Sequence, residues 1–486
     1  MSRPSSWLNP QFVSLWAITW ALALTALIPL VNAWTPLLGQ QYENYWTPGV
    51  PWRLDLYWHG AIFIPLVVVG ACLVCMIFRL EEVRGTASRL LRESMLYGGL
   101  IAPPLAGIAG IFDVYDRFAM GIPLWLQIIG FLIGDEIAIA LIVAMLLYPK
   151  QSGKGYHEMG LPYYTALVAL FGILIAAVEG HIAGWITWFG PWPSFVASYI
   201  NSTMYPVLGY YNATAVQTWA VNVVTSHSHT MLPLIMAGIV ALVATSFGYY
   251  EMKGSPRFLS QLGFLVMAYM IVAVTWLYVV AGVGNYSIPT LFQSGPNGLA
   301  MDDAMTGMIG WGALLVIIGL VVYMKRNGRL RDPVFLAILV AGILIYLTIP
   351  VTGYYIEFHE SYYGFATPGQ GPGWMHDAVY LRFHQDFGFF VLPSVIVALL
   401  FFRGMKLPST VERKTSYMLI AGMTIAFAGG EAYFITLASP ALYVAIAGAA
   451  LIWLGLAVAT YNAWKVYMSA PQFGCEACIG PGRHSR

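Results

Sequence analysis

The sequence predicts an all-α fold, that of a polytopic integral membrane protein with about 12 transmembrane helices. Apolar residues make up 59% of the 486 residues and charged residues only 9%, whereas an ordinary soluble domain carries about 25% charged residues. Apolar runs of about 20 residues or more, the length that crosses a bilayer, follow one another along nearly the whole chain. Lysine and arginine gather in alternate breaks between these runs, a pattern typical of membrane proteins.

The apolar runs predict twelve spans in a single transmembrane helical domain over residues 1–470, followed by a short polar tail over residues 471–486. The first run is too long for a signal peptide and has no cleavage site of small residues near its end, so we expect it to be the first span. The predicted spans cover residues 12–33, 55–78, 95–115, 122–148, 162–188, 215–248, 259–284, 303–324, 333–355, 377–402, 416–437 and 440–464.

The basic residues of the loops set the predicted orientation. Lysine or arginine follows each even-numbered span up to the tenth; Arg79 and Arg84 follow the second, for example. The loops on the other side, such as residues 190–214 and 285–300, carry almost none. The positive-inside rule therefore places both termini and the tail in the cytoplasm, an N-in, C-in topology.

Net charge and cysteine usage exclude several classes of protein. A net charge of +1 leaves no basic excess for nucleic acid and no polybasic membrane anchor. Cys475 and Cys478 form a CxxC without a second pair or a following histidine, so neither a zinc site nor a c-type haem attachment is indicated.

We expect the lipid bilayer as the main partner and the membrane of a prokaryotic cell as the location.

Five of the nine histidines fall within predicted spans, where an ionisable group costs about 2.5–3.5 kcal/mol on insertion scales. A single histidine there is usually a neutral imidazole hydrogen-bonded to a neighbouring helix. In the predicted topology, however, all five lie in the outer half of the bilayer, roughly 5–12 Å deep for the shallower ones at 1.5 Å per residue. Imidazole is well suited to haem iron and copper, so this shared depth favours a haem-carrying role. The five are His59, His181, His227, His229 and His384.

Five of the carboxylates within predicted spans are candidates to mark proton routes or to form structural hydrogen bonds. Asp386 has a further alternative, an ion pair with Arg382 one helical turn earlier. Glu179 lies two residues from His181 and forms the most suggestive pair with it. The five are Asp135, Glu136, Glu179, Asp386 and Glu431.

The tenth predicted span resembles the tenth helix of subunit I of the haem-copper oxidases. His376 and Asp377 are followed by AVYLRF and then by HQDFG, which begins at His384. In that family an HD pair, a short apolar stretch and an HxH motif recur at this place, and the twelve-helix N-in, C-in layout is similar. The resemblance implies that His384 holds a haem and that His59, early in the second span, is a low-spin haem ligand. It also implies a helix 6 copper ligand, a position occupied here by one of the two histidines in SHSH.

The chain departs from that family in three respects. One histidine remains of the HxH motif, with Asp386 or Arg382 where the other would be. The seventh span and its outer loop, AGVGNYSIPTLFQ, contain no His-His pair, and the helix 6 tyrosine pattern is missing. The sequence thus predicts a divergent relative that has a haem but lacks the usual oxygen-reducing copper centre.

From these residues we expect a haem b-binding membrane subunit of a respiratory or other redox complex, which moves electrons near the outer face, with or without coupled proton movement. His59 and His384 come early in spans that run in the same direction, and we expect them to be the axial ligands of one low-spin haem. Other subunits of the complex and a quinone or external electron donor are the expected partners.

A second polar site is expected between the fifth and sixth spans, where His181, His227 and His229 would hold a metal such as copper, a second haem or only hydrogen bonds. His227 and His229 are two residues apart, so they point about 200° apart on a regular helix and cannot chelate one ion from it. An unusual terminal oxidase or nitric oxide reductase is the alternative within redox chemistry. A secondary transporter is the alternative from another class, because Pro103, Pro104, Pro233 and Pro350 would break helices.

Overall fold

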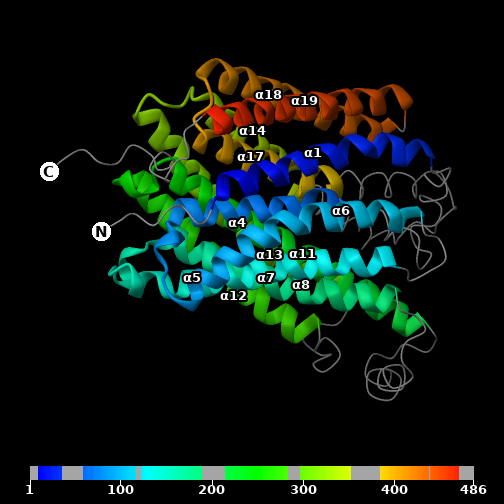
Figure 1. The fold of residues 1–486 in the computed structure, drawn as a ribbon, viewed down its shortest axis with the longest axis horizontal. Coiled ribbons are helices and arrows are strands. Elements are labelled where there is room, and N and C mark those ends of the chain that lie inside the picture. The colour runs from blue at the N-terminus through cyan, green and yellow to red at the C-terminus, as the bar shows by residue number, and fades with distance from the viewer. Residues whose placement is uncertain are drawn as a thin grey trace. The chain divides into compact units, whose positions relative to one another are not determined.

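The computed structural model describes residues 9–34, 58–115, 122–188, 214–282, 296–351, 384–436 and 438–469. Helices make up nearly all of these residues, and no strand lies among them (Figure 1). In these ranges ten helices are long and apolar enough to cross a membrane, and two shorter apolar helical segments accompany them, Thr230–Ser246 and Pro333–Ile349. The predicted all-α, multi-pass membrane class is therefore confirmed. The number of twelve spans and their orientation stay predictions, and the tail at 471–486 lies outside the described residues.

The helices pack as two compact units, and the first comprises residues 1–158, 245–248 and 321–486. Its elements are α1 (Pro10–Trp34), η1 (His59–Phe63), α4 (Ile64–Phe78), η2 (Leu80–Glu82), α5 (Thr86–Glu93), η3 (Ser94–Gly98), α6 (Gly99–Tyr115), α7 (Ile122–Gln151), η4 (Tyr156–Glu158), α14 (Pro333–Tyr346), η7 (Leu347–Val351), η8 (His384–Val391), α17 (Leu392–Gly404), α18 (Ser409–Thr436) and α19 (Ser439–Ser469).

The second unit comprises residues 159–244 and 249–320. Its elements are α8 (Leu161–Trp188), α11 (Thr214–Ser246), η6 (Tyr249–Glu251), α12 (Ser255–Gly282) and α13 (Pro296–Arg326), the ends of α11 and α13 belonging to the first unit. A Cβ atom at Gly172 of α8 would meet Leu234 of α11 and Thr275 of α12. This glycine therefore lies where three helices of the second unit come together.

Four π-helical segments interrupt the described helices, and each has a proline in it or shortly after it. Pro65 follows η1, Pro103 follows η3, Pro350 lies within η7, and Pro393 follows η8. A proline ring clashes with the carbonyl group four residues earlier and offers no N–H group to it. The wider π-helical turn relieves this clash, so the prolines give a physical reason for where these turns occur.

Three of the four prolines singled out in the sequence lie inside continuous helices. α6 continues through Pro103 and Pro104, and α11 continues through Pro233. Pro350 lies in the π-helical turn η7 at the end of α14. Proline is tolerated in membrane helices because local π-helical adjustment and neighbouring groups satisfy the carbonyl groups that it leaves unbonded.

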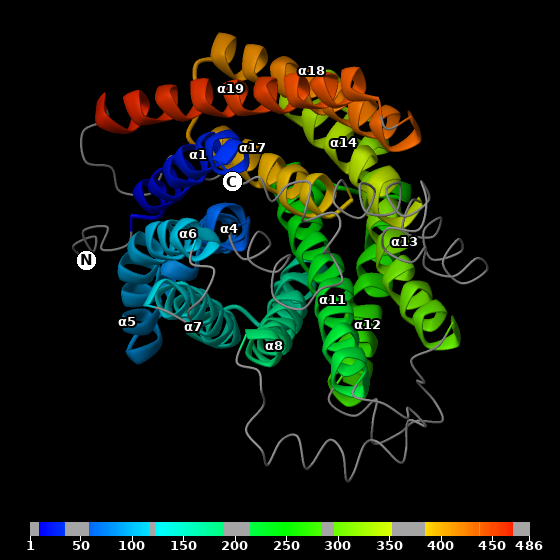
Figure 2. The same ribbon diagram turned by 90° about the vertical axis from the view of Figure 1, so that its right-hand side faces the viewer.

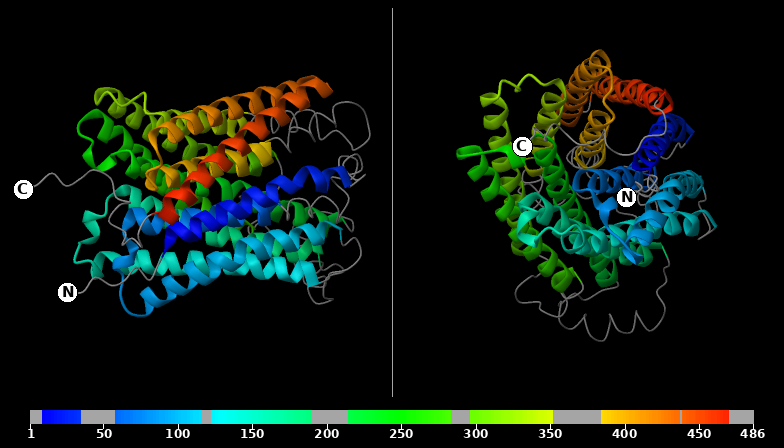
Figure 3. Two further views of the ribbon diagram at one scale, coloured as in Figure 1. Left: turned by 45° about the horizontal axis from the view of Figure 1, so that its top comes forward. Right: turned by 60° about the vertical axis from the view of Figure 1, so that its left-hand side comes forward.

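Small residues allow the closest helix contacts of the first unit. α18 and α19 pack as an antiparallel pair, orange and red in Figure 3, with Gly422, Gly429 and Gly448 at their interface. A Cβ atom at Gly448 would meet the backbone of Ala426, so no larger residue fits there. Such contacts are typical of helices that associate in a bilayer. α19 packs on α1, α1 on α6 and α6 on α7 (Figure 2), so two helices separate α19 from α7.

Candidate functional site

His59 begins the π-helical segment η1 and is half-buried among aromatic rings. Its imidazole centre lies 5.7 Å from the ring centre of Phe63, 6.3 Å from that of Phe131 and 5.3 Å from that of Phe390, each in an edge-on arrangement. The next residue, Gly60, lies so close to α6 that a Cβ atom there would meet the backbone carbonyl group of Ala106. The sequence thus positions His59 through a glycine contact on one side and three phenylalanines around the ring.

His384 begins a second π-helical segment, η8, and this segment contacts η1. Since α4 and α17 also pack together, the two helices run parallel and bring the starts of η1 and η8 to the same end of the unit. Phe390 of η8 shares a small core with Ala61 and Ile62 of η1 and with Leu24 of α1. The backbone of the segment that carries His384 therefore lies against the segment that carries His59, while the side chain of His384 lies outside the described residues.

His227 lies on α11 against α8 in the second unit. Its Nδ1 atom is 2.6 Å from the carbonyl oxygen of Ala176. Because a carbonyl oxygen only accepts hydrogen bonds, Nδ1 carries the hydrogen, and Nε2 has the lone pair in the neutral ring. Metal-bound histidines are usually oriented in this way, by a hydrogen bond from the other ring nitrogen. A Cβ atom at Gly180 would lie 2.6 Å from the His227 ring, so glycine makes the room for it.

The antiparallel contact between α8 and α11 brings part of the predicted second site together. Gly172 faces Leu234 and Gly180 faces His227, so the helices keep one register over this stretch. His181 is half-buried and follows directly after Gly180. The side chains of Glu179 and His229 lie outside the described residues. Among the side chains that the structure does describe, no group of three metal-binding residues is present, so the metal at this site stays a prediction.

The candidate carboxylates differ in their surroundings. Glu136 is exposed on α7 and accepts a hydrogen bond of 3.0 Å from the hydroxyl group of Ser94. Asp135 is half-buried on the neighbouring face. Glu431 is half-buried on α18, and no hydrogen bond or ion pair joins it to any residue in the described ranges. The side chain of Asp386, like that of Glu179, lies outside those ranges.

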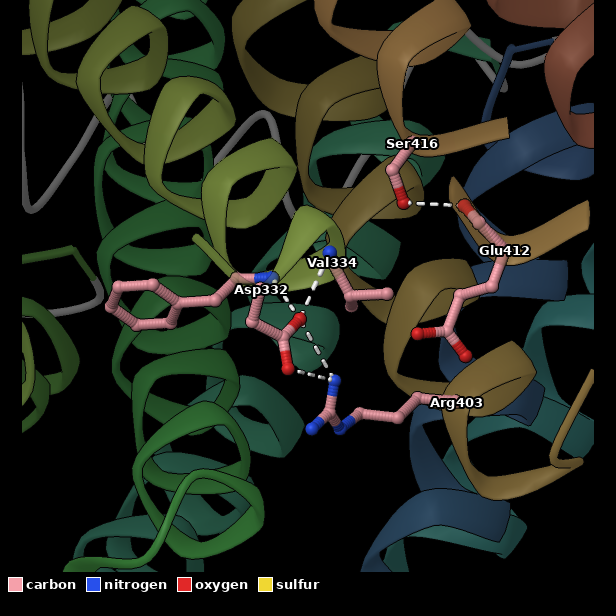
Figure 4. Close-up of polar contacts among 6 residues, drawn as sticks. Asp332, Val334, Arg403, Glu412 and Ser416 are labelled. Atoms are coloured by element: carbon pink, nitrogen blue, oxygen red, sulfur yellow. Dashed lines mark hydrogen bonds and ion pairs between the residues drawn. The ribbon is translucent and has the colours of Figure 1, made fainter. Parts of the chain in front are cut away.

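The sequence reasoning missed a polar cluster at the opposite end of the first unit, where α17 ends and α14 begins. Asp332 caps α14 by accepting from the backbone N–H groups of Val334 and Phe335, each at 3.1 Å (Figure 4). One nitrogen of the Arg403 guanidinium lies 3.0 and 2.9 Å from the two Asp332 oxygens, and the guanidinium also stacks on the ring of Phe247. An aspartate followed by proline and an apolar run is a helix-start signal, so the cap was readable from the sequence.

A second polar cluster lies at the same end, between α4 and α7. Tyr148 is buried and donates to Glu82 at 3.2 Å, while Lys154 donates to the Tyr148 hydroxyl oxygen at 3.4 Å. Arg79 pairs with Glu82 at 3.0 Å. Burial raises the pKa of the neighbouring Glu81 above its ordinary value. We call this end of the unit, with the Asp332 and Tyr148 clusters, the basic end, and the end with η1 and η8 the histidine end.

These helices define the class of the protein, a multi-pass α-helical integral membrane protein. No protein-family model, curated protein or solved structure matches the chain. The function therefore has to be argued from the chain's own residues.

Proposed function

We propose that the chain is a haem b-binding integral membrane subunit of a redox complex, with His59 and His384 as the two axial ligands of one low-spin haem. The observation that carries this proposal is the contact between η1 and η8, two π-helical segments that each begin at a candidate ligand. π-helical turns are rare and occur frequently at functional sites. Bis-histidine ligation requires two imidazoles on facing helices at related depth.

The surroundings of His59 fit such a group. The three phenylalanine rings present apolar surface of the kind that packs on a porphyrin face, and imidazole is a common axial ligand of haem iron. His384 lies six residues before Phe390, the residue that touches His59. The two residues belong to the same π-helical segment, η8.

The second polar site, between α8 and α11, supports a metal or a second haem as a further part of the proposal. The hydrogen bond from His227 to Ala176 leaves Nε2 as the nitrogen that can ligate a metal. This ring and His181 would hold copper or a second haem, while His229, which points about 200° away on α11, would bond elsewhere in the protein. A metal there would suit the alternative redox function, an unusual terminal oxidase or nitric oxide reductase.

The proposal also includes the number of spans and their orientation in the membrane. Twelve spans with both termini in the cytoplasm of a prokaryotic cell, in a bundle like subunit I of the haem-copper oxidases, would place both histidine sites in the outer half of the membrane. Partner subunits and a quinone or external donor would then deliver electrons from that side. Cysteine labelling of residues 80–93 and 190–214 from outside the cell tests this, because the orientation requires that only the second loop react.

The test of the haem site is spectroscopic. A pyridine haemochrome spectrum of the purified protein should show haem b, and both His59→Ala and His384→Ala should lose the low-spin spectrum. His157→Ala is the matched control, because the His157 side chain is 86% exposed on η4. Its spectrum should equal that of the unmodified protein.

Three results would contradict parts of the proposal. A low-spin spectrum retained in either alanine variant would show that the ligand pair is wrong. A high-spin haem in the unmodified protein that His59→Ala leaves unchanged would assign His384 as the ligand of a five-coordinate haem. Absence of haem from the purified protein would overturn the redox function and leave the secondary transporter as the alternative.

A further inference from the structure

A third π-helical segment meets the two that begin at the proposed haem ligands. η7 contacts η8, and η8 in turn contacts η1. π-helical turns are rare and occur frequently at functional sites, and these contacts link three of the four that lie in the described helices. η7 begins at no candidate ligand, so its place beside η8 calls for another role.

Gly388 is the residue through which η8 lies against η7. A Cβ atom at this position would lie 2.9 Å from Cγ1 of Ile349 and 3.2 Å from Cγ2 of Thr348. Both distances are shorter than an ordinary van der Waals contact, so glycine allows the two segments to approach this closely. Gly388 comes four residues after His384, and a π-helical turn takes about four to five residues. The contact with η7 therefore lies one turn after the residue proposed as a haem ligand.

Thr348 is held in one orientation on the η7 side of this contact. The residue is 1% exposed, and its hydroxyl group donates to the carbonyl oxygen of Leu344 at 2.6 Å. A threonine has two heavy atoms on Cβ and few allowed rotamers, so this hydrogen bond fixes the side chain. With the hydroxyl group bonded back to α14, the methyl group is the part that meets Gly388.

A different part of η8 contacts the surroundings of His59. Phe390, two residues after Gly388, shares a small core with Ala61 and Ile62 of η1. Its ring centre lies 5.3 Å from that of His59. η8 thus contacts η7 through Gly388 and η1 through Phe390, so a displacement of η8 at the first contact would change its position relative to His59.

We propose that η7 positions the axial ligands of the haem, with Thr348 as the positioning residue that acts on His384 through Gly388. This inference rests on the proposed function, because it concerns the same haem site. Groups that do not touch a metal orient its ligands, and the surroundings of a haem tune its reduction potential. Here the means is packing. The methyl group of Thr348 sets how closely η8 approaches η7, and thereby the orientation of the ligand at the start of η8.

The test compares the haem in variants of the full chain purified in detergent. Thr348→Ser removes the methyl group that meets Gly388 and keeps the hydroxyl group that bonds to Leu344. It should shift the electron paramagnetic resonance g-values of the low-spin haem, because these report the orientation of the axial ligands, and it should shift the midpoint potential. Gly388→Ala, whose methyl group displaces η8 from η7, should shift both by more.

Two positions on α19, a helix that carries none of the π-helical segments, provide the matched controls. Thr460 is buried and donates to the carbonyl oxygen of Leu456 at 2.7 Å, the same kind of bond that Thr348 makes. A Cβ atom at Gly455 would lie 3.2 Å from a methyl group of Leu419. Thr460→Ser and Gly455→Ala therefore make the same chemical changes, and both should leave the g-values and the potential unchanged.

The outcomes separate this inference from the proposed function. Thr348→Ser removes a single methyl group, so it decides the matter even where Gly388→Ala does not fold. A low-spin haem with the same g-values and potential in Thr348→Ser as in the unmodified protein would overturn the role of η7 and leave the proposed ligands in place. Equal shifts in the α19 controls would also overturn it. Absence of haem from the unmodified protein would instead overturn the proposed function, and this inference with it.

Discussion

The two ends of the first unit are held by different kinds of interaction. At the basic end, charged and hydroxyl side chains are matched one to another, as in the pairs of Arg403 with Asp332 and of Tyr148 with Glu82. At the histidine end, the described contacts of His59 are with aromatic rings, on backbone wound as π-helix. The difference indicates a division of roles. Paired charges fix the helix ends at the basic end, whereas under the proposed function the imidazole at the other end serves as a haem ligand.

If the chain binds haem as proposed, this comparison predicts that substitutions at the basic end lower stability without altering the haem spectrum, and that substitutions at the histidine end alter the spectrum. The largest effect is expected for Asp332→Ala. It removes a helix cap and leaves Arg403 without its carboxylate, and because both side chains are partly exposed we expect a loss of about 2–4 kcal/mol. Thermal unfolding in detergent measures it. Asp332→Asn keeps the capping oxygen and should lose less. A changed spectrum in folded Asp332→Ala would contradict the division.

Gly60→Ala should have the next largest effect, because its new methyl group meets the backbone of α6 at Ala106 and not a side chain that could move aside. Overpacking of this kind costs about 1–3 kcal/mol, and the shift of η1 should also change the low-spin spectrum. Gly70→Ala on α4 is the matched control, since nothing lies within 4 Å of its Cβ position. Both thermal unfolding and absorption spectra are needed. Equal behaviour of the two variants would show that η1 is not held by this contact.

Phe390→Leu tests whether the aromatic contact with His59 affects the haem. Loss of the ring that touches His59 should cost about 0.5–1.5 kcal/mol and shift the haem absorption bands. Phe401→Leu on the same helix is the control. Phe401 is fully buried towards the basic end, so this variant should lose stability with an unchanged spectrum. A band shift in Phe401→Leu as large as that in Phe390→Leu would remove the distinction between the two ends.

Tyr148→Phe should have the narrowest effect, on stability alone, because it removes only the hydroxyl group between Glu82 and Lys154. A hydrogen bond of this kind contributes about 0.5–1.5 kcal/mol, and the ring itself stays in place. Thermal unfolding should show a drop of that size, and the haem spectrum should not change. No drop at all would mean that the Tyr148 cluster does not stabilise the basic end.

Much of the fold could be predicted from the sequence because a bilayer demands long apolar helices. The apolar runs located helices such as α7 and α12 to within a few residues, since hydropathy alone determines what crosses a membrane. The cap at Asp332 could also have been found, because Asp-Pro before an apolar run is a local signal. The π-helical segments were not predicted, although Pro65 and Pro393 mark their places.

The candidate sites were harder to predict, because their geometry depends on contacts between distant parts of the chain. Nothing in the sequence near His59 indicates that Phe390 lies against it, more than 300 residues away. The tautomer of His227 follows from the carbonyl group of Ala176 on another helix. The sequence predicts the span that carries Glu136, but not that its side chain is exposed on α7. Hydropathy gives the depth of a residue in the membrane but not the direction in which it faces.

The π-helical turn at η1 has a consequence for how the chain tolerates insertions and deletions. A π-helical turn is an α-helix that has absorbed one extra residue. Deletion of one residue between His59 and Ile64 would let the segment return to ordinary α-helix, with a turn of about 100° and a rise of about 1.5 Å between His59 and the rest of α4. The direction of the imidazole is thus set by the number of residues in one turn, so a one-residue change in length would redirect it.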